Sequence, residues 1–204
     1  QNKKIAIYGM GKSGISTAKK LQTLKAKVFC WDDKTTIRKK INFKFSKFWK
    51  ETSKNSIDYI VISPGIDIKK CKIRKYLNKN RKKIITDLDI FFEINNNPYV
   101  ISVTGTNGKS TTCRIIEKIL KKGKYNVKLG GNIGFPVLSL QNNKKNNIFI
   151  LEISSYQLEY SKLFKSKHAA ILNISPDHLE RHKSISNYLK IKSKIFLKQE
   201  KNDF

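Results

Sequence analysis

The sequence predicts an α/β protein with two domains, each built on a parallel β-sheet. Short apolar runs alternate with helical patterns along the 204 residues, and such alternation is typical of parallel sheets. Two glycine-rich turns, at residues 9–14 and 105–111, each lie between an apolar run and a helical pattern. The chain is long enough for two small domains that fold without disulfides, and two is the number we expect.

The first domain is expected over residues 1–94. A strand is predicted at KIAIY, residues 4–8, and it is followed by the first glycine turn and a helical pattern at 15–24. Two further apolar runs, at 27–33 and 57–65, are also predicted as strands. The first of these runs ends in two acids and the second in Ser-Pro-Gly, so the segment alternates β and α elements.

The polar stretch NNNP at 95–98 is predicted as a linker, because Asn and Pro favour turns. The second domain then covers 99–204, and its first strand is expected at YVISVT, residues 99–104. The helix after the second glycine turn is predicted to place four apolar residues on one face: Ile115, Ile116, Ile119 and Leu120. Gly123 is expected at its C-terminal cap.

Two more buried strands are predicted at NIFILEIS, residues 147–154, and HAAILNIS, residues 168–175. Each ends in polar residues, and in open parallel sheets ligands bind at the carboxyl ends of the strands. The residues that follow these strands are therefore candidates for contact with a ligand. A lysine-rich helix is predicted at 186–201.

The formal net charge of +28 raises the hypothesis of a nucleic-acid-binding protein. Of the 43 basic residues, however, 38 are Lys, whereas the bidentate contacts of specific nucleic-acid readers favour Arg. The lysines are scattered through every segment. We therefore interpret the charge as compositional bias and expect no nucleic-acid partner; a DNA-binding protein would show an affinity that falls steeply with salt.

Cysteine usage and hydropathy indicate a cytoplasmic protein. Cys30, Cys71 and Cys113 form no CxxC pair and are odd in number, which fits a reducing compartment. No run approaches the roughly 18 apolar residues that a membrane span needs, and the amino terminus lacks the apolar region of a signal peptide. We expect neither a membrane partner nor export.

The first glycine turn, GMGKSG, matches G-x-G-x-x-G and is followed by Asp32 and Asp33 at the end of the next predicted strand. The glycines would permit a tight turn and the close approach of a diphosphate to N–H groups at a helix start. An acidic residue at the second strand's end could accept hydrogen bonds from sugar hydroxyls or a base. NAD and a UDP-sugar both fit this pattern, and the alternative is a turn that needs glycine for its geometry alone.

The second turn lies in VTGTNGKST, residues 103–111. A mononucleotide phosphate loop needs small residues so that N–H groups face the phosphates, a Lys to bridge them and a hydroxyl to hold Mg²⁺. Gly105, Gly108, Lys109 and Ser110 fill those roles, although the spacing G-x-x-G-K-S is shorter than the usual G-x-x-x-x-G-K-S. The preceding β-run and the amphipathic helix that follows argue against an incidental Gly-Lys turn.

GTNGKST after such a strand resembles the ATP loop of the Mur ligases and their folylpolyglutamate synthetase relatives. Four further segments extend the resemblance: GMGKSGIS at the front, GGNIGFP at 130–136, LEISSYQLE at 151–159 and LNISPDHLERH at 172–182. Together they are similar to the D-glutamate-adding branch of the family. The resemblance runs from the first residue to about residue 200.

The resemblance implies a Rossmann-like UDP-substrate domain followed by the first part of a P-loop ATPase-like domain, without the amino-acid-binding carboxy-terminal domain. It implies an ATP-dependent ligase of peptidoglycan synthesis that adds D-glutamate to UDP-N-acetylmuramoyl-L-alanine through an acyl phosphate. ATP and Mg²⁺ are the implied cofactors, and we expect a monomer. Without the last domain, the 204-residue chain is expected to bind substrate but not to turn over.

The resemblance also implies roles for individual residues. The ATP loop would comprise Gly105, Thr106, Asn107, Gly108, Lys109, Ser110 and Thr111. The UDP substrate would contact Lys12, Ser13, Asp32, Asp33, Lys34, Ser63, Pro64, Gly65, Asn132 and Ser154. Magnesium would be held by Ser110, Glu152, His178 and Lys192, and the catalytic residues would be Lys109, His178 and Lys192. The other histidines, His168 and His182, are expected to be structural.

Lys192 matches the family lysine that carbon dioxide carbamylates, which would make it an anionic ligand for a second Mg²⁺. Such chemistry requires a free amine, and hence a lysine whose pKa is lowered by burial or by its neighbours. From the residue pattern alone, a solvated helix lysine among Lys190, Lys194 and Lys198 would be the expected alternative.

Two other functions remain as alternatives. One is an NAD-dependent oxidoreductase built on GMGKSG, but a dehydrogenase needs no second phosphate loop with a lysine and a magnesium ligand. The other is a sister ligase of the same family that adds a different amino acid. Phosphate release with D-glutamate, compared with L-alanine and L-lysine, would separate these functions.

Overall fold

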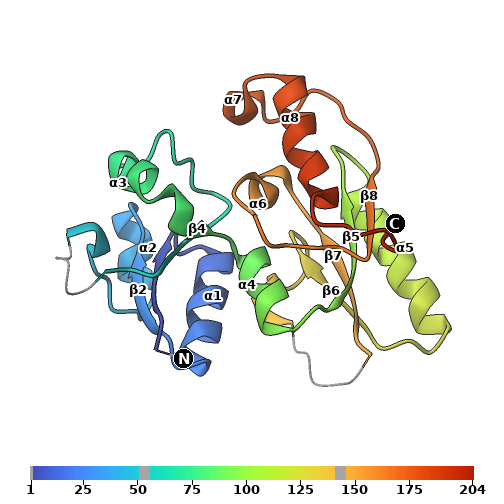
Figure 1. Cartoon of the computed structure of the whole chain (residues 1–204), viewed down its shortest axis with the longest axis horizontal. Helices are drawn as coiled ribbons and strands as arrows, with labels where there is room; N and C mark the ends of the chain where they lie inside the picture. Colours follow the sequence, from blue (N-terminus) through green and yellow to red (C-terminus); the bar gives the residue numbers. More distant parts are fainter. Residues whose placement is uncertain (1, 51–55, 141–145) are drawn as a thin grey trace. The chain divides into compact units, whose positions relative to one another are not determined.

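The computed structural model describes residues 2–50, 56–140 and 146–204 (Figure 1). The chain divides into two compact units, Gln1–Asp87 and Leu88–Phe204. Each unit contains one four-stranded parallel sheet, so the prediction of an α/β protein with two parallel sheets is confirmed. Within the described ranges, no helix combines the length and the apolar character that crossing a membrane would require.

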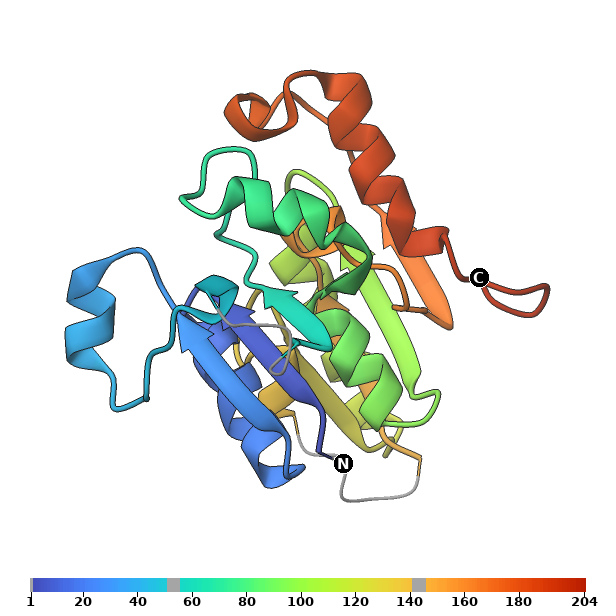
Figure 2. The same ribbon diagram turned by 60° about the vertical axis from the view of Figure 1, so that its left-hand side comes forward.

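The sheet of the first unit has the strand order β2-β1-β3-β4. Its strands are β1 (Lys4–Tyr8), β2 (Lys27–Trp31), β3 (Tyr59–Ile62) and β4 (Ile84–Ile85). The central strand β1 pairs in parallel with both β2 and β3, and Figure 2 shows β1 and β2 side by side. The carboxyl ends of these strands therefore lie at one edge of the sheet.

The helical segments of the first unit are α1 (Lys12–Thr23), α2 (Thr35–Lys40), η1 (Phe48–Lys50), α3 (Arg74–Lys79) and η3 (Arg81–Lys83). Helix α1 follows the first glycine turn and buries Ala18 and Leu21 in the core. A Cβ on Gly14 would lie 2.0 Å from the Gly9 carbonyl oxygen. The third glycine of the turn is therefore required by the close approach of helix and strand end.

The sheet of the second unit has the order β6-β7-β5-β8. Its strands are β5 (Tyr99–Thr104), β6 (Val127–Gly131), β7 (Ile148–Glu152) and β8 (His168–Ile171). Val103 of β5 lies opposite Glu152, and Thr104 lies opposite Ile171. The end of β5, where the second glycine turn begins, thus lies between the ends of β7 and β8.

The helical segments of the second unit are α4 (Asp87–Ile94, which begins at the last residue of the first unit), α5 (Lys109–Lys122), η4 (Val137–Ser139), α6 (Ser155–Glu159), α7 (Leu179–His182), α8 (Ile185–Lys192) and η5 (Ser193–Phe196). Helix α5 begins directly after the second glycine turn, and Gly123 is its C-cap residue as predicted. The short helices α6 and α7 both pack against α8.

The predicted core face of α5 is partly wrong. Ile116 and Leu120 pack against the core cluster that contains Cys113. Ile115 and Ile119, by contrast, are 52% and 64% exposed. Spacings of three and four residues place 113, 116 and 120 on one side of a helix, whereas Ile115 and Ile119 lie about 100° away around the axis.

Two other predictions about the second unit need correction. Strand β8 is not fully buried, because β5 is the only named strand that pairs with it within the described ranges. The predicted helix at 186–201 is shorter: α8 ends at Lys192 and continues as the 3₁₀ segment η5 to Phe196. Beyond it, the Ala169 N–H donates to the Phe204 carbonyl at 2.6 Å, so the last residue lies along the outer edge of β8.

Candidate functional site

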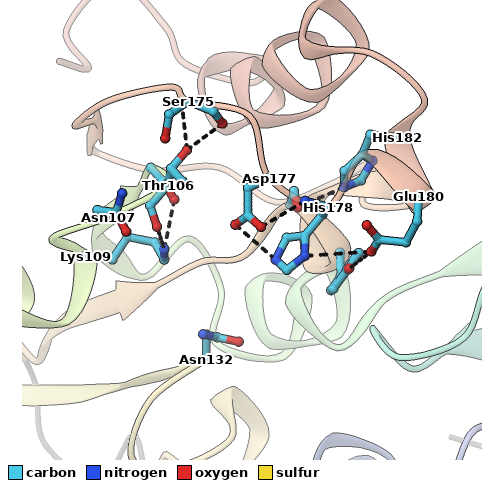
Figure 3. Close-up of polar contacts among 12 residues, drawn as sticks. Thr106, Asn107, Lys109, Asn132, Ser175, Asp177, His178, Glu180 and His182 are labelled. Carbon is cyan, nitrogen blue, oxygen red and sulfur yellow. Dashed lines mark hydrogen bonds and ion pairs between the residues drawn. The ribbon is translucent and has the colours of Figure 1, made fainter.

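The second glycine turn connects β5 to α5 and is braced by the segment that follows β8. The Asn173 side-chain oxygen accepts hydrogen bonds from the N–H groups of Thr106 and Asn107, at 3.1 and 2.9 Å. The Thr106 hydroxyl accepts from the Ser175 N–H at 3.0 Å (Figure 3). Asn173 and Ser175 were absent from the predicted site, because their role depends on the pairing of β8 with β5.

Lys109 is the first residue of α5, and its ammonium turns back over the loop. The Lys109 Nζ donates to the carbonyl oxygens of Gly105 and Thr106, at 2.9 and 2.7 Å. These contacts place a positive charge at the same loop whose N–H groups begin helix α5. A helix start with a lysine beside it favours the binding of anionic phosphate.

The next residue, Ser110, reaches the end of the neighbouring strand. Its hydroxyl donates to Glu152 Oε2 at 2.6 Å, and the Asn132 side-chain amide donates to Glu152 Oε1 at 2.7 Å. Glu152 is buried, with an exposed fraction of only 2%. A buried carboxylate whose two side-chain donors are neutral is a strong attractor for a cation.

The chemistry of this donor set fits magnesium. Mg²⁺ prefers hard oxygen ligands, and Ser110 and Glu152 supply a hydroxyl and a carboxylate that already meet. The residues that the structure describes contain no cluster of three or more His, Cys, Asp or Glu side chains that would hold a metal unaided.

Gly131, the last residue of β6, allows its backbone to approach that of Glu152 closely at this edge of the sheet. Its φ is 106°, and an added Cβ would lie 2.2 Å from the Glu152 carbonyl oxygen, which accepts the Asn132 N–H at 2.8 Å. We expect Gly131→Ala to lower the free energy of unfolding by at least about 2 kcal/mol, since strain and overlap both act.

Urea denaturation of the 204-residue chain measures this effect. Gly65→Ala is the control, because nothing lies within 4 Å of the added Cβ. It should change the free energy of unfolding by less than about 0.5 kcal/mol. An equally small change for Gly131→Ala would contradict the role assigned to this glycine.

Lys192, the last residue of α8, is buried with 1% exposure. Its Nζ donates to the Thr104 hydroxyl at 3.1 Å and to the Gly105 carbonyl at 2.8 Å, and it lies 4.7 Å from the centre of the Tyr188 ring. Burial, reinforced by the nearby Lys109 charge, lowers the pKa of Lys192 from 10.5 to about 8. The lysine is therefore not the solvated helix residue that the bare pattern would suggest.

His178 precedes α7 in a left-handed conformation, with φ 51° and ψ 33°. Its Nε2 lies 3.4 Å from an Asp177 oxygen and its Nδ1 lies 3.9 Å from a Glu180 oxygen. Figure 3 shows Asp177 beside the His178 ring. The ring also packs 4.8 Å from that of Tyr156, on α6.

The two remaining histidines have structural surroundings. His182 is buried, and its Nε2 lies 3.0 Å from the Ser155 hydroxyl. Burial lowers the pKa of His182, which favours the neutral ring. His168 stacks against Phe204 and bonds to the Tyr99 hydroxyl at 2.7 Å.

Ser154 caps α6. Its hydroxyl accepts from the Gln157 N–H, and the Gln157 side chain accepts from the Ser154 N–H at 3.0 Å. This reciprocal capping box fixes the start of the helix at Ser155, three residues after the end of β7. The predicted contact of Ser154 with substrate, like that of Asn132, stays a prediction.

In the first unit, two of the predicted substrate residues, Asp32 and Ser63, bond to the glycine turn. Asp32 accepts from the N–H groups of Met10 and Lys34, at 2.7 and 2.8 Å. The Ser63 hydroxyl donates to the Gly9 carbonyl at 2.6 Å. These bonds join the turn to the ends of β2 and β3, and so fix the N–H groups that open α1.

Asp33 is half-buried and has hydrogen-bond partners within the protein. It accepts from the Tyr8 hydroxyl at 2.5 Å and from the Trp31 indole N–H at 3.1 Å. Burial, followed by the bond to Asp33, raises the pKa of Tyr8. The Asp33 carboxylate therefore joins the ends of β1 and β2, and a contact with uridine would have to form beside these two hydrogen bonds.

The other predicted residues of the first unit lie in or beside turns: Lys12 and Ser13 open α1, Lys34 is the N-cap of α2, and Pro64 and Gly65 follow β3. Arg38 was not predicted. Its guanidinium lies 4.5 Å from the centre of the Trp31 ring and donates to the Asp32 carbonyl at 2.5 Å. One Arg within a lysine-rich helix carries no sequence signal for such a contact.

Two family models match the chain. The model described as Mur ligase middle domain matches residues 103–204, and the model described as Mur ligase MurD-like, N-terminal domain, matches residues 3–85. The sequence is 39% identical over 204 residues to a UDP-N-acetylmuramoylalanine--D-glutamate ligase of Rickettsia bellii, covering 98% of this chain and 44% of the relative. The enzyme of the same name from Wolbachia pipientis wMel is 38% identical, with 96% and 39% covered.

Solved structures show the same fold. A UDP-N-acetylmuramate:L-alanyl-gamma-D-glutamyl-meso-diaminopimelate ligase from Neisseria meningitides superposes with a TM-score of 0.60 at 14% identity, over 96% of this chain and 68% of that one. A UDP-N-acetylmuramate-alanine ligase from Thermotoga maritima gives a TM-score of 0.52 at 20% identity, over 94% and 46%. The chain spans less than half the length of the two curated relatives.

Proposed function

Because the chain belongs to the Mur ligase family, we propose that it forms part of an enzyme that joins D-glutamate to UDP-N-acetylmuramoyl-L-alanine with hydrolysis of ATP. Curated relatives of that name are similar to the chain along nearly its whole length. One observation carries the proposal for this chain itself. The phosphate loop places Ser110 on the buried Glu152, beside the ammonium of Lys109 and the buried amine of Lys192.

The reaction has two steps. A carboxylate oxygen of UDP-N-acetylmuramoyl-L-alanine attacks the γ-phosphorus of ATP, and the bond to the β-phosphate oxygen breaks, which yields an acyl phosphate and ADP. The D-glutamate amine then attacks the acyl carbon, phosphate leaves with the bonding pair, and the amine loses a proton as the amide forms. Phosphoryl transfer of this kind depends mainly on positioning and on charge neutralisation.

The residues of the phosphate loop supply both the positioning and the charge neutralisation. The N–H groups at the start of α5 and the Lys109 ammonium bind the phosphates, and the Asn173 contacts hold the loop in shape for them. Ser110 and Glu152 would hold Mg²⁺, which would neutralise charge on the phosphates. Asn132 orients Glu152 by donating to its second oxygen.

Lys192 is carbamylated in the active enzyme. Its neutral amine adds to the carbon of CO₂, forming an N–C bond and releasing one proton, so that the side chain becomes an anion. With a pKa of about 8, roughly a tenth of the amine is neutral at pH 7, against about one part in three thousand at the ordinary pKa of 10.5. The resulting carboxylate and His178 would hold a second Mg²⁺.

The first unit binds the UDP moiety. The glycine turn presents N–H groups at the start of α1, and Asp32 and Ser63 hold that turn by bonds to Met10 and Gly9. Lys12 and Ser13 lie at the diphosphate and Lys34 near the uridine. Family membership leaves no reason to retain the NAD-dependent oxidoreductase.

The enzyme works as a cytoplasmic monomer without a nucleic-acid partner. Cys30 and Cys113 are buried free thiols, and burial raises the pKa of both, which keeps them unreactive. Sedimentation of the 204-residue chain at 0.15 M salt should give a single species of about 24 kDa. A stable dimer would contradict the monomer.

Phosphate release by the protein extended to the length of its relatives tests the activity. We expect release only with ATP, Mg²⁺, UDP-N-acetylmuramoyl-L-alanine and D-glutamate together, and at least about a hundredfold less with L-alanine or L-lysine in place of D-glutamate. Equal or greater release with another amino acid would favour a sister ligase. The 204-residue chain alone should show no substrate-dependent release.

A further inference from the structure

Helix α6 is short, but it is firmly joined to the strand that carries Glu152. Glu152 ends β7, and the Ser154–Gln157 capping box starts α6 at Ser155. Ser155, Gln157 and Leu158 are buried. The five-residue helix is therefore a rigid extension of the strand, and elements bound to it take their position from Glu152.

The segment that carries His178 is bound to α6 by an ion pair. The Arg181 guanidinium places two nitrogens, Nε and one terminal nitrogen, each 2.7 Å from Glu159 Oε2. The two side chains are only 8% and 11% exposed. Such a charged pair, with more than one N–H directed at a carboxylate and little water near it, defines geometry more sharply than a surface pair.

Two further contacts join the same segment to α6. His182 bonds to Ser155 at 3.0 Å, and the Tyr156 hydroxyl donates to Glu180 at 3.2 Å. The segment needs such support, because both residues that flank α7, His178 and Lys183, have positive φ values of 51° and 74°. Non-glycine residues keep that conformation only where their surroundings hold it.

The element that carries Lys192 is bound to the other end of α6. The Lys194 Nζ donates to the carbonyl oxygens of Leu158 and Glu159, at 3.3 and 2.6 Å. These are the terminal carbonyls of α6, where a cation is favoured. Lys194 lies two residues after Lys192, so this bond fixes the end of α8.

We propose that α6 is a common support that sets His178 and Lys192 relative to Glu152, with Arg181, Glu159 and Lys194 as positioning residues. The inference rests on the proposed function for the roles of His178 and Lys192. The contacts themselves lie outside the phosphate loop. Loosening them should disturb the second magnesium site while leaving the UDP-binding residues of the first unit unchanged.

Arg181→Met in the full-length enzyme tests this inference. We expect kcat to fall at least tenfold and the Mg²⁺ concentration for half-maximal rate to rise at least tenfold, with the KM for the UDP substrate changed less than threefold. Glu159→Gln combined with Arg181→Met should lose no more than Arg181→Met alone, because the two residues act through one pair. Lys121→Met is the matched control, because its ion pair with Glu117, also 2.7 Å long, lies on the exposed side of α5.

A second readout does not depend on activity. The chain has three histidines, and in the 204-residue protein the imidazole resonances of His178 should shift in Arg181→Met while those of His168 stay in place. Arg181→Lys, which keeps the charge, should give smaller shifts and serves if the first variant does not fold. Unchanged His178 resonances in a folded variant, or a changed KM with unchanged Mg²⁺ dependence, would overturn the inference. No phosphate release by the unmodified enzyme, with the His178 shifts present, would refute the proposed function alone.

Discussion

Lys192→Ala is expected to reduce kcat of the full-length enzyme by about a thousandfold or more, because it removes the anionic ligand that carbamylation would create. It also removes the bonds of the Nζ to Thr104 and Gly105 at the start of the phosphate loop. Lys190→Ala is the matched control, because Lys190 lies on the same helix and is exposed. That variant should keep its activity within about twofold.

Carbon dioxide dependence separates carbamylation from a simple loss of packing. Depleting dissolved CO₂ should inactivate the unmodified enzyme, and bicarbonate should restore it. Since the amine is neutral above its pKa of about 8, the requirement for CO₂ should become stronger as the pH falls below 8. ¹³C-labelled bicarbonate should give a carbamate resonance that is missing in Lys192→Ala. Full activity of that variant, or no response to bicarbonate, would exclude the role.

Lys109→Ala should slow the reaction by a different route. The substitution removes the cation that lies over the loop, and phosphoryl transfer loses a major part of its charge stabilisation. We expect kcat to fall by about a thousandfold, with the affinity for the UDP substrate within threefold of normal. Lys118→Ala, on the exposed side of the same helix, is the control and should be active. A weakened UDP-substrate affinity with unchanged kcat would show that Lys109 serves another ligand.

Six of the eight strands that the structure describes, all but β4 and β6, and both glycine turns could be predicted from the sequence because each depends on a local pattern. A strand end, a glycine turn and a helix start follow one another in the chain, and parallel pairing then brings the ends of β5 and β7 together. Ser110 and Glu152, 42 residues apart, meet for that reason. Their residue types, a hydroxyl and a carboxylate, already indicated a magnesium site.

Contacts that depend on exact packing could not be predicted from the sequence. The hydrogen bonds between Asn173 and the phosphate loop depend on the register of β8 against β5. The burial of Lys192 depends on how α8 packs over the loop. The side of α5 that faces the core was misjudged because four apolar residues at 115, 116, 119 and 120 fit two adjacent faces of a helix. The bond between Asp33 and Tyr8, 25 residues earlier, could not be predicted because no local pattern indicates it.

The most direct measurement is the amide spectrum of the 204-residue chain titrated with ATP and Mg²⁺. If the loop between β5 and α5 binds the triphosphate, the N–H resonances of Gly108, Lys109 and Ser110 should shift together, and replacing Mg²⁺ with Mn²⁺ should broaden Ser110 and Glu152 first. Lys109→Ala should remove the shifts, whereas Lys118→Ala should retain them. The account would be contradicted if the resonances of this loop did not change when nucleotide and metal were added, or if the shifts were confined to the first glycine turn at residues 9–14.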